Sequence, residues 1–371
     1  MARAISNVPQ EVATLSLMVD VGGRLERRGS IAGQYCSLGR AFEMNVASAS
    51  AGYSFRPQLL ERRARLQAAA GSVPTGYFNE LIAEIDSALQ RIEIGSYGLC
   101  EACHLPIEGD LLERDPLVRY CLPHLSQAEL LAYQQDLELA AQIQAKLLPP
   151  RDVGLENWDT QYRYVPAGAV GGDYCELIPL GDGNSLFFAV GDVAGKGVAA
   201  SLLMTHLSAI FRSLLLLDLS LVDMVSRANR LFCESTAAAH YATLVCGRAT
   251  SSGLEICNAG HCPGLLLQRG ATQRLGSTGL PLGLFCGGQY TVTPISIGAG
   301  ESLVLYSDGI TEAQDPAGDE YQEERLITSL RDRFEQGAGA MADAVLRDVA
   351  RFCRTHPPVD DMTLLVVRRR G

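Results

Sequence analysis

Residues 185–197 read SLFFAVGDVAGKG. The first half of this stretch is a short apolar run, which is typical of a buried β-strand. Asp192 ends the run, and the glycines behind it predict a loop whose backbone can approach a metal, with a helix opening near Val198. The loop is not a Walker A motif, because only three residues separate its first two glycines and no Ser or Thr follows Lys196. The stretch therefore predicts a core strand that ends at a functional carboxylate.

Similar apolar runs recur through the C-terminal half of the chain. They are ATLVCGRAT (242–250), GLEICNAG (253–260), YTVTPISI (290–297), ESLVLYSDG (301–309) and MTLLVVRR (362–369). Helical patterns lie near residues 198–217, 221–236, 322–334 and 339–355. Adjacent strands joined by Gly and Ser turns favour antiparallel sheets covered by helices over a doubly wound parallel sheet. The predicted fold class is therefore α+β.

Further carboxylates stand in a glycine-rich stretch or at the ends of these predicted strands. Asp173 follows GAVGG, Asp308 ends SLVLYSD, and the pair Asp360-Asp361 precedes the last strand. A single Asp at a strand end is most often a turn or cap residue, but several in one domain indicate a shared site. Oxygen ligands that converge from strand ends suit Mg²⁺ or Mn²⁺, and two such ions about 4 Å apart can activate a water against a phosphoryl group.

A second ligand set lies upstream. Cys100, Cys103, Cys121 and His124 have the spacing C-x2-C-x17-C-x2-H. Two close pairs of this kind are typical of structural zinc, and four protein ligands leave no open position for chemistry. The alternatives are reduced core cysteines at chance spacing, and His104 as a competing ligand, although neighbours in the chain rarely reach one tetrahedron together.

Helical patterns flank this motif on both sides. Upstream, LLERRARLQAAA, the turn GSVPTG and YFNELIAEIDSALQRIEIG predict a helical hairpin. One buried stripe is expected on its second helix, formed by Leu81, Ile82, Ile85, Leu89 and Ile92. Downstream, Ser126 and Glu129 predict a capping box, and Pro149-Pro150 ends the helix. The positions Leu130, Tyr133, Leu137, Ala140, Gln144 and Leu147 have heptad spacing, which fits either a dimeric coiled coil or an ordinary amphipathic helix.

The composition is that of a folded, acidic protein. The chain has 371 residues, 47% of them hydrophobic, and a net charge of −11. Two or three domains are expected from this length, and direct binding to nucleic acid is not expected from this charge. No apolar run approaches the ~18 residues of a membrane span, and no export signal is evident. We therefore expect a cytoplasmic protein whose cysteines outside the zinc motif are reduced and buried. Residues 1–55 show no motif and are expected to be partly disordered.

The motifs GGDY, AVGDVAGKG, NAGHCPG, PLGL, LYSDGITEA and DDMTLLVV, in that order, closely resemble the SpoIIE/RsbU-type branch of the metal-dependent (PPM) serine/threonine phosphatases. The resemblance implies a β-sandwich flanked by helices, with two Mn²⁺ or Mg²⁺ at one edge. It implies that Asp192 bridges both ions. One ion also takes Asp173 and the Val193 carbonyl, and the other takes Asp308 and Asp360. Three of these residues, Asp192, Asp308 and Asp360, are the expected catalytic set.

Other residues in the resemblance, which covers about residues 137–368, have open roles. Asp361 is expected behind the ligands or facing the substrate. Lys196 either contacts the substrate phosphate or is a solvated loop cation. His261 in NAGHCPG is either a catalytic acid or a hydrogen-bonded residue of a buried turn. The Gly-His pair and the phosphate-binding Arg of eukaryotic-like members have no counterpart here, so leaving-group protonation stays unassigned.

The zinc motif has a resemblance of its own. DSALQRIEIGSYGLCEAC and RYCLPHL are similar to the DksA/TraR zinc-finger family, over about residues 58–128. Members act on RNA polymerase through an acidic hairpin tip. This chain has His124 in place of a fourth Cys, a short hairpin and a tip, GSVPTG, without acidic residues. The segment LELAAQIQAKLLPP resembles the linker helix that dimerises and switches phosphatases of the first family.

These observations predict an unassigned segment (1–55), a zinc-finger domain (56–128), a linker helix (129–150) and a phosphatase domain (151–371). The expected activity is hydrolysis of phosphoserine or phosphothreonine on a regulatory protein, namely a STAS-type anti-sigma-factor antagonist. It would need two Mn²⁺ or Mg²⁺, with one Zn²⁺ upstream and a homodimer formed through the linker helix. The alternatives are a transcription regulator that binds RNA polymerase and has a weak or inactive phosphatase domain, and a non-catalytic scaffold.

Overall fold

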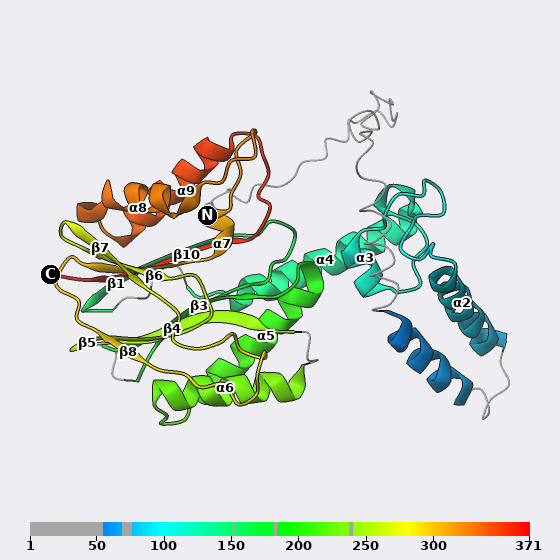
Figure 1. The fold of residues 1–371 in the computed structure, drawn as a ribbon, viewed down its shortest axis with the longest axis horizontal. Coiled ribbons are helices and arrows are strands. Elements are labelled where there is room, and N and C mark those ends of the chain that lie inside the picture. The colour runs from blue at the N-terminus through cyan, green and yellow to red at the C-terminus, as the bar shows by residue number, and fades with distance from the viewer. Residues whose placement is uncertain (1–54, 69–75, 151–152, 154, 182–183, 237–239) are drawn as a thin grey trace, which may run out of the picture.

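The computed structural model describes residues 55–68, 76–150, 153, 155–181, 184–236 and 240–371. A small helical unit and a larger two-sheet unit lie at opposite ends of this part of the molecule, and helix α4 (Gln127–Leu147) runs between them (Figure 1). The expected disorder of residues 1–55 lies outside the described residues except for its last position. The turn GSVPTG lies outside them except for Gly76.

The helical unit contains the predicted hairpin. A helix over residues 55–68 lies beside α2 (Gly76–Glu93), and Arg63 Nε donates to Asp86 Oδ1 across the pair at 2.6 Å. Of the five residues of the predicted stripe, Ile85 is fully buried and the others are half-buried. Two short elements complete the unit after α2: α3 (Gly109–Arg114) and the 3-10 turn η2 (Leu122–His124).

Helix α4 begins with the predicted capping box, in which Ser126 and Glu129 bond to each other's backbone N–H groups. All six residues of the predicted heptad stripe are buried or half-buried within this chain, and Tyr133 and Gln144 are the most buried. The exposed apolar residues of α4 lie on another face: Leu131, Leu139 and Ile143. The stripe is therefore the face that an amphipathic helix packs against its own chain, and it is not free to serve as a dimer seam.

Two five-stranded sheets form the larger unit, and every strand pair in them is antiparallel. One sheet has the order β1 (Trp158–Val165), β10 (Met362–Arg369), β9 (Ser302–Tyr306), β6 (Gly264–Gln268), β7 (Ala271–Leu275). The other has the order β2 (Asp173–Pro179), β3 (Leu186–Val193), β4 (Ala242–Thr250), β5 (Gly253–Ala259), β8 (Thr293–Ile295). This confirms the predicted antiparallel α+β fold.

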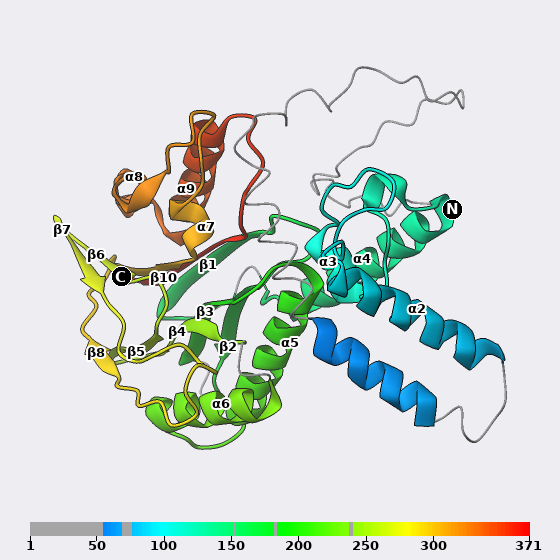
Figure 2. The same cartoon turned by 45° about the vertical axis from the view of Figure 1, so that its right-hand side comes forward.

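The sheets pack face to face, and helices cover both outer faces (Figure 2). Between the sheets lie the fully buried side chains of Trp158, Phe188, Leu303 and Leu365. On one side α5 (Gly197–Leu214) and α6 (Leu221–Ser235) cover the β2–β8 sheet. On the other, α8 (Gln322–Arg331) and α9 (Ala338–Cys353) cover the β1–β7 sheet, together with the short α7 (Asp308–Thr311) and η3 (Phe334–Gln336). A dry core between two sheets and an apolar layer under each helix pair give the sandwich its stability.

Several expectations need correction. The run YTVTPISI forms only the three-residue strand β8, because it lies at a sheet edge and contains Pro294, whose nitrogen cannot donate to a ladder. Four strands had no predicted counterpart: β1, β2, β6 and β7. The cysteines are not all buried, since Cys286 is exposed, and Cys36 lies outside the described residues.

One described helix, α5, is long and apolar enough to cross a membrane by length and composition. It packs here as a core helix, with Met204, Leu207 and Phe211 buried against the β2–β8 sheet and α6. Its apolar character is therefore explained by packing in the sandwich.

Candidate metal centre and upstream cysteine cluster

Both sheets bring carboxylates to the same end of the sandwich. Asp173 opens β2 and lies opposite Asp192 near the end of β3. Asp308 follows β9 directly, and Asp360 and Asp361 precede β10, which is paired with β9. The predicted carboxylates therefore meet, because two antiparallel strand pairs, β2–β3 in one sheet and β9–β10 in the other, end side by side.

Hydrogen bonds join the two sheets at this point. Ser307 Oγ and Thr363 Oγ1 both donate to Asp173 Oδ2, at 2.7 and 2.5 Å. In the opposite direction, Asp361 Oδ2 accepts from the Gly172 N–H at 2.6 Å, and its Oδ1 accepts from the Ala167 N–H at 2.8 Å. Asp361 is thus held by the backbone of the β1–β2 loop. Asp361 also lines a cavity beside Lys196, so these contacts do not decide between its two expected roles.

The cluster concentrates negative charge in a partly buried site. Burial raises the pKa of Asp173 well above its usual value, and repulsion by Asp192 adds to this while the Thr363 hydroxyl opposes it. Burial, followed by repulsion from Asp308 and its neighbours, raises the pKa of Asp192 to about 7. The pKa of Asp308 is also raised, by burial and then by Asp360. Carboxylates that repel one another in this way form the donor set that hard divalent cations neutralise.

Three glycines allow the chain to approach the carboxylates closely. A Cβ on Gly171 would collide with the Asp361 carboxylate, and one on Gly309 would collide with the Asp361 carbonyl oxygen. A Cβ on Gly172 would lie 3.1 Å from the Val193 carbonyl oxygen, which is a predicted ligand. The glycine of SDG is therefore required by the packing around the site, because its Cβ would meet backbone, and the glycines of GGDY let the loop lie close to Asp361 and to the Val193 carbonyl.

Lys196 contacts this cluster as a cation. Its Nζ lies 2.8 Å from Asp360 Oδ2 and donates to the Val359 carbonyl at 3.1 Å, while its side chain stays 65% exposed. Because the ion pair is exposed, it neutralises only part of the charge. A shallow cavity of about 250 Å³ lies beside this lysine, between Leu137 of α4 and Val170 of the β1–β2 loop. The donor set, the uncompensated charge and the adjoining cavity all fit bound Mg²⁺ or Mn²⁺.

His261 lies in a buried turn next to the site. Its backbone N–H donates to Asn258 Oδ1 at 2.8 Å, and its Nδ1 is 2.8 Å from Thr243 Oγ1. Burial lowers the pKa of His261 to about 4, against an opposing effect of the Tyr306 backbone. The imidazole is therefore neutral at pH 7, as in a hydrogen-bonded structural turn. The Gly260 backbone in the same turn has a φ of +74°.

Helix α4 reaches the site through one polar side chain. Gln144 Nε2 donates to the Gly171 carbonyl at 2.6 Å, and the Gly171 N–H donates back to Gln144 Oε1 at 3.1 Å. Gln144 is buried, whereas its neighbours Gln142 and Ile143 are exposed. Helix α4 is therefore hydrogen-bonded to Gly171, whose neighbour Gly172 holds Asp361.

Sequence reasoning missed the supporting residues of the site. Ser307, Thr363 and Gln144 each bond a carboxylate or the loop that holds one. A signal for two of them was present, because Ser307 directly precedes the predicted ligand Asp308 in LYSDG and Thr363 stands three positions after the predicted ligand Asp360 in DDMT. Gln144 had a weaker signal, as a polar residue inside an apolar stripe.

The upstream cysteine motif also comes together. The ligand atoms of Cys100, Cys103, Cys121 and His124 all lie within 4.8 Å of one another. Cys121 Sγ is 3.2 Å from His124 Nδ1, and Cys103 Sγ is 3.7 Å from Cys121 Sγ. His104 is not part of this cluster in the described residues. Three thiols and one imidazole at such distances fit a tetrahedral zinc ion.

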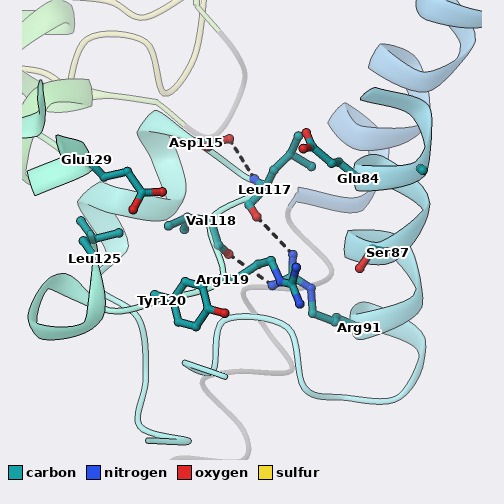
Figure 3. Close-up of a pocket in the computed structure, with 11 residues that line it drawn as sticks. Glu84, Ser87, Arg91, Asp115, Leu117, Val118, Arg119, Tyr120, Leu125 and Glu129 are labelled. Carbon is teal, nitrogen blue, oxygen red and sulfur yellow. Dashed lines mark hydrogen bonds between the residues drawn. The ribbon is translucent and has the colours of Figure 1, made fainter. Parts of the chain in front are cut away.

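A pocket of about 430 Å³ lies in the same helical unit, between α2 and the loop before η2 (Figure 3). The buried Arg91 donates to the carbonyls of Leu117 and Val118 across it, each at 3.3 Å. Charges of both signs line its wall, including Glu84 and Arg119. Such a mixed lining does not select a single class of charged ligand.

Known proteins resemble part of the chain. Protein IcfG of Synechocystis sp. is 28% identical over 268 residues, which cover 63% of this chain and 41% of IcfG. Phosphoserine phosphatase RsbU of Bacillus subtilis is 25% identical, over 68% of this chain and 77% of RsbU. The chain thus spans less than half of the first relative and about three quarters of the second.

Solved structures agree with the fold. The SiaA-PP2C domain of Pseudomonas aeruginosa superposes with a TM-score of 0.58 at 20% identity, covering 65% of this chain and 98% of that domain. The larger unit therefore has a PP2C-like fold with two antiparallel sheets. The family model of Stage II sporulation protein E (SpoIIE) matches residues 182–370, which is more than half of the chain. With its PP2C-like sandwich and strand-end carboxylates, the chain belongs to the SpoIIE family.

Proposed function

We propose that this chain is a metal-dependent protein serine/threonine phosphatase. The observation that supports this most is the meeting of four strand-end carboxylates in a SpoIIE-family sandwich, with raised pKa values at Asp173, Asp192 and Asp308. Two relatives carry the name phosphoserine phosphatase. By the family resemblance, Asp192 would be a ligand of two Mn²⁺ or Mg²⁺ ions. Asp173 and the Val193 carbonyl would hold one of them, and Asp308 and Asp360 would hold the other.

Bound ions would supply an activated water and would neutralise the phosphoryl oxygens. The residues of the chain hold the ligands in place. Ser307 and Thr363 fix the carboxylate of Asp173 from the opposite sheet, and two backbone N–H groups fix Asp361. Lys196 is exposed at the mouth of the site, where its ammonium can meet a substrate phosphate.

The proposed phosphatase activity is tested by measuring the rate of hydrolysis of p-nitrophenyl phosphate and of a phosphoserine peptide, with and without Mn²⁺. We expect Mn²⁺-dependent turnover of both by the wild type and its loss in Asp192→Ala. Asp218→Ala is the matched control, because Asp218 is an exposed carboxylate away from the site. Turnover that survives in Asp192→Ala, or that needs no divalent metal, would contradict the proposal.

The substrate proposed is a phosphorylated STAS-type anti-sigma-factor antagonist, on the strength of the family resemblance. A phosphorylated STAS protein should be hydrolysed with a higher kcat/KM than a peptide of the same phosphosite. Equal values would show that the folded STAS surface contributes nothing. Co-purification of the chain with RNA polymerase, together with absence of turnover, would favour the alternative function as a transcription regulator.

The upstream cluster is proposed to hold one structural Zn²⁺. Four protein donors close the coordination sphere, so the ion contributes folding energy and no chemistry. Cys100→Ser should lose about one zinc per chain and destabilise the helical unit. Cys353→Ser, a partly buried cysteine of α9, is the control and should keep its zinc. Full zinc retention in Cys100→Ser would refute this ligand set.

Regulation is proposed to pass through α4, because Gln144 joins it to the loop that holds Asp361. If the chain forms a homodimer through α4 in the cytosol, the exposed residues Leu131, Leu139 and Ile143 are the face available for it. Leu139→Glu should then convert a dimer to a monomer in sedimentation, while Gln142→Glu should not. A monomeric wild type would rule out this dimer.

A further inference from the structure

Another cavity adjoins the segment that leads into the predicted ligand Asp360. Its volume is about 270 Å³, and its walls come from the second half of α9, the start of β10 and the residues that follow α7. Pro358 and Val359 line this cavity and also the cavity beside Lys196. The two cavities therefore share a wall, and the side chain of Val359 in that wall is 56% exposed.

The lining of this cavity is mainly apolar. Leu346 and Val349 of α9 and Met362 of β10 contribute to it, and its polar side chains are those of Gln314, Arg354 and His356. Arg354 and His356 are exposed, and no acidic residue of the described chain lines the cavity. The volume lies just below the range of about 300–1,000 Å³ that small-molecule sites occupy. Its size and lining therefore suit a single apolar side chain, and the exposed guanidinium of Arg354 suits a partner that is negatively charged.

The backbone beside the cavity is pre-formed. The chain leaves α9 through Arg354, which has a left-handed φ of +56°, and the His356 N–H donates back to the last residue of α9 at 2.9 Å. The rings of Pro357-Pro358 then fix two further φ angles. After them, the Val359 carbonyl accepts from Lys196 Nζ at 3.1 Å. Because the segment is held in this way, a side chain can bind beside it without the cost of ordering a loop.

We propose that this cavity is a subsite for an apolar side chain of the phosphoprotein substrate, close in sequence to the phosphorylated residue. This inference rests on the proposed phosphatase function. Both segments that carry predicted ligands of one ion reach the cavity. Val359 directly precedes Asp360, and Ala313 follows the short helix α7 that Asp308 opens. A few residues of extended chain, each spanning about 3.3 Å, therefore connect the phosphate position with the cavity across the exposed Val359.

The test measures kcat/KM of the full-length, zinc-loaded wild type at saturating Mn²⁺ for a series of phosphoserine peptides. One peptide contains only Gly and Ser around the phosphoserine, and each of the others has a single Leu at one of the three positions on either side. We expect at least one Leu position to raise kcat/KM about tenfold or more, because an apolar side chain gains this much in a fitted apolar cavity. Equal values across the series would overturn the subsite and leave the phosphatase standing. Absence of Mn²⁺-dependent turnover of every peptide and of p-nitrophenyl phosphate would overturn both.

A variant that fills the cavity assigns the preference to it. Ala350 lines the cavity from an exposed position of α9, so Ala350→Phe places a ring in the cavity without replacing a core side chain. This variant should lose the preference for the Leu peptide over the Leu-free peptide. The control is Ala299→Phe, the same change at an exposed alanine beside Gly371, at the other end of β10 from Asp360. It should keep the preference. A preference that persists in Ala350→Phe would overturn the proposal.

Cys353 gives a readout that does not depend on turnover and that the wild type alone can supply. This partly buried thiol lines the cavity. A phosphonate analogue of the preferred peptide, which is not hydrolysed, should slow alkylation of Cys353 by N-ethylmaleimide, whereas the Leu-free analogue should not. Equal rates of alkylation would overturn the proposal. A wild-type dimer that Ala350→Phe converts to a monomer, without any Leu preference, would assign the cavity to contact between two copies of the chain and would also overturn it.

Discussion

Asp192→Asn should stabilise the metal-free protein at neutral pH while it abolishes metal-dependent turnover. The carboxylate of Asp192 has its pKa raised to about 7 by burial and by neighbouring carboxylates. Without bound cations, its ionisation therefore costs stability. An amide has nearly the shape of the carboxyl and does not ionise, so the variant escapes this cost. The same substitution removes the predicted bridging ligand.

The magnitude follows from the difference between the folded and unfolded pKa values. An unfolded Asp titrates near 3.8, and Asp192 titrates near 7 in the fold. Because the folded pKa is the higher one, the folded state binds the proton more tightly. The stability from this proton is fully present below pH 3.8 and is lost as the pH rises through 7. A difference of about three units at roughly 1.4 kcal/mol per unit gives a cost of about 4 kcal/mol at pH 8. At pH 5 the cost is only about 1.5 kcal/mol.

The assay is urea unfolding with Mg²⁺ and Mn²⁺ omitted rather than chelated, so that zinc is retained. Trp158 is the single tryptophan and is fully buried in the sandwich, so its fluorescence reports that unit alone. Asp192→Asn should exceed the wild type in free energy of unfolding, and the excess should be about 2–3 kcal/mol larger at pH 8 than at pH 5. Asp218→Asn is the control and should show no excess. A variant less stable than the wild type at pH 8, or an excess that does not depend on pH, would refute the reasoning.

Three other changes test the residues that support the centre. Gln144→Leu leaves two buried backbone groups of Gly171 without a hydrogen-bond partner, at a cost of about 1–3 kcal/mol each. The variant should therefore need a higher Mn²⁺ concentration for half-maximal hydrolysis of p-nitrophenyl phosphate. The exposed control Gln142→Leu should not. Thr363→Val removes a charge-assisted hydrogen bond to Asp173. The variant should raise the same Mn²⁺ requirement about tenfold or more, while kcat at saturating Mn²⁺ is retained. An unchanged Mn²⁺ requirement would contradict the role of Thr363. Gly309→Ala should lower the free energy of unfolding by about 1–3 kcal/mol in the Trp158 assay, because its Cβ collides with backbone; a neutral effect would show that the loop relaxes freely.

The strands that sequence could predict are those buried on both faces. β3 is almost wholly buried between its own helices and the facing sheet, so it reads as an uninterrupted apolar run. β7 is an edge strand with the sequence ATQRL and is mostly exposed, so its sequence does not differ from that of a loop. β1 alternates buried and half-buried residues over WDTQYRYV, a signal diluted by Arg163, whose guanidinium pairs with Asp343 of α9. A local sequence pattern does not show contacts of this kind, because the second residue lies far away in the chain.

The sequence of β2 does not predict a strand, for a different reason. Its Glu176 is buried, yet it accepts from Ser208 and Arg212 of α5, at 2.7 and 2.8 Å. A charged residue in the middle of a short run argues against a core strand unless a partner is known. The partners lie more than thirty positions away, so only the fold could supply them. By contrast, Asp192, Asp308 and Asp360 could be singled out because each stands at the end of a predicted strand, which is a local feature. Asp173 opens β2, which was not predicted, so this residue was singled out through the GGDY motif instead.

The position of Gln144 shows how far a periodic pattern can be interpreted. Heptad spacing identified correctly which face of α4 is buried, but it could not say what buries it. A primary amide presents one donor and one acceptor, the same pair that a peptide group offers, and Gln144 uses both on Gly171. The neighbouring peptide N–H, that of Gly172, holds Asp361, and the next residue is Asp173. A shift of α4 that breaks the amide pair therefore acts within two residues on a predicted ligand. Since glycine offers no side chain to hold this loop otherwise, the loss is not absorbed locally, and metal affinity should respond before the fold does.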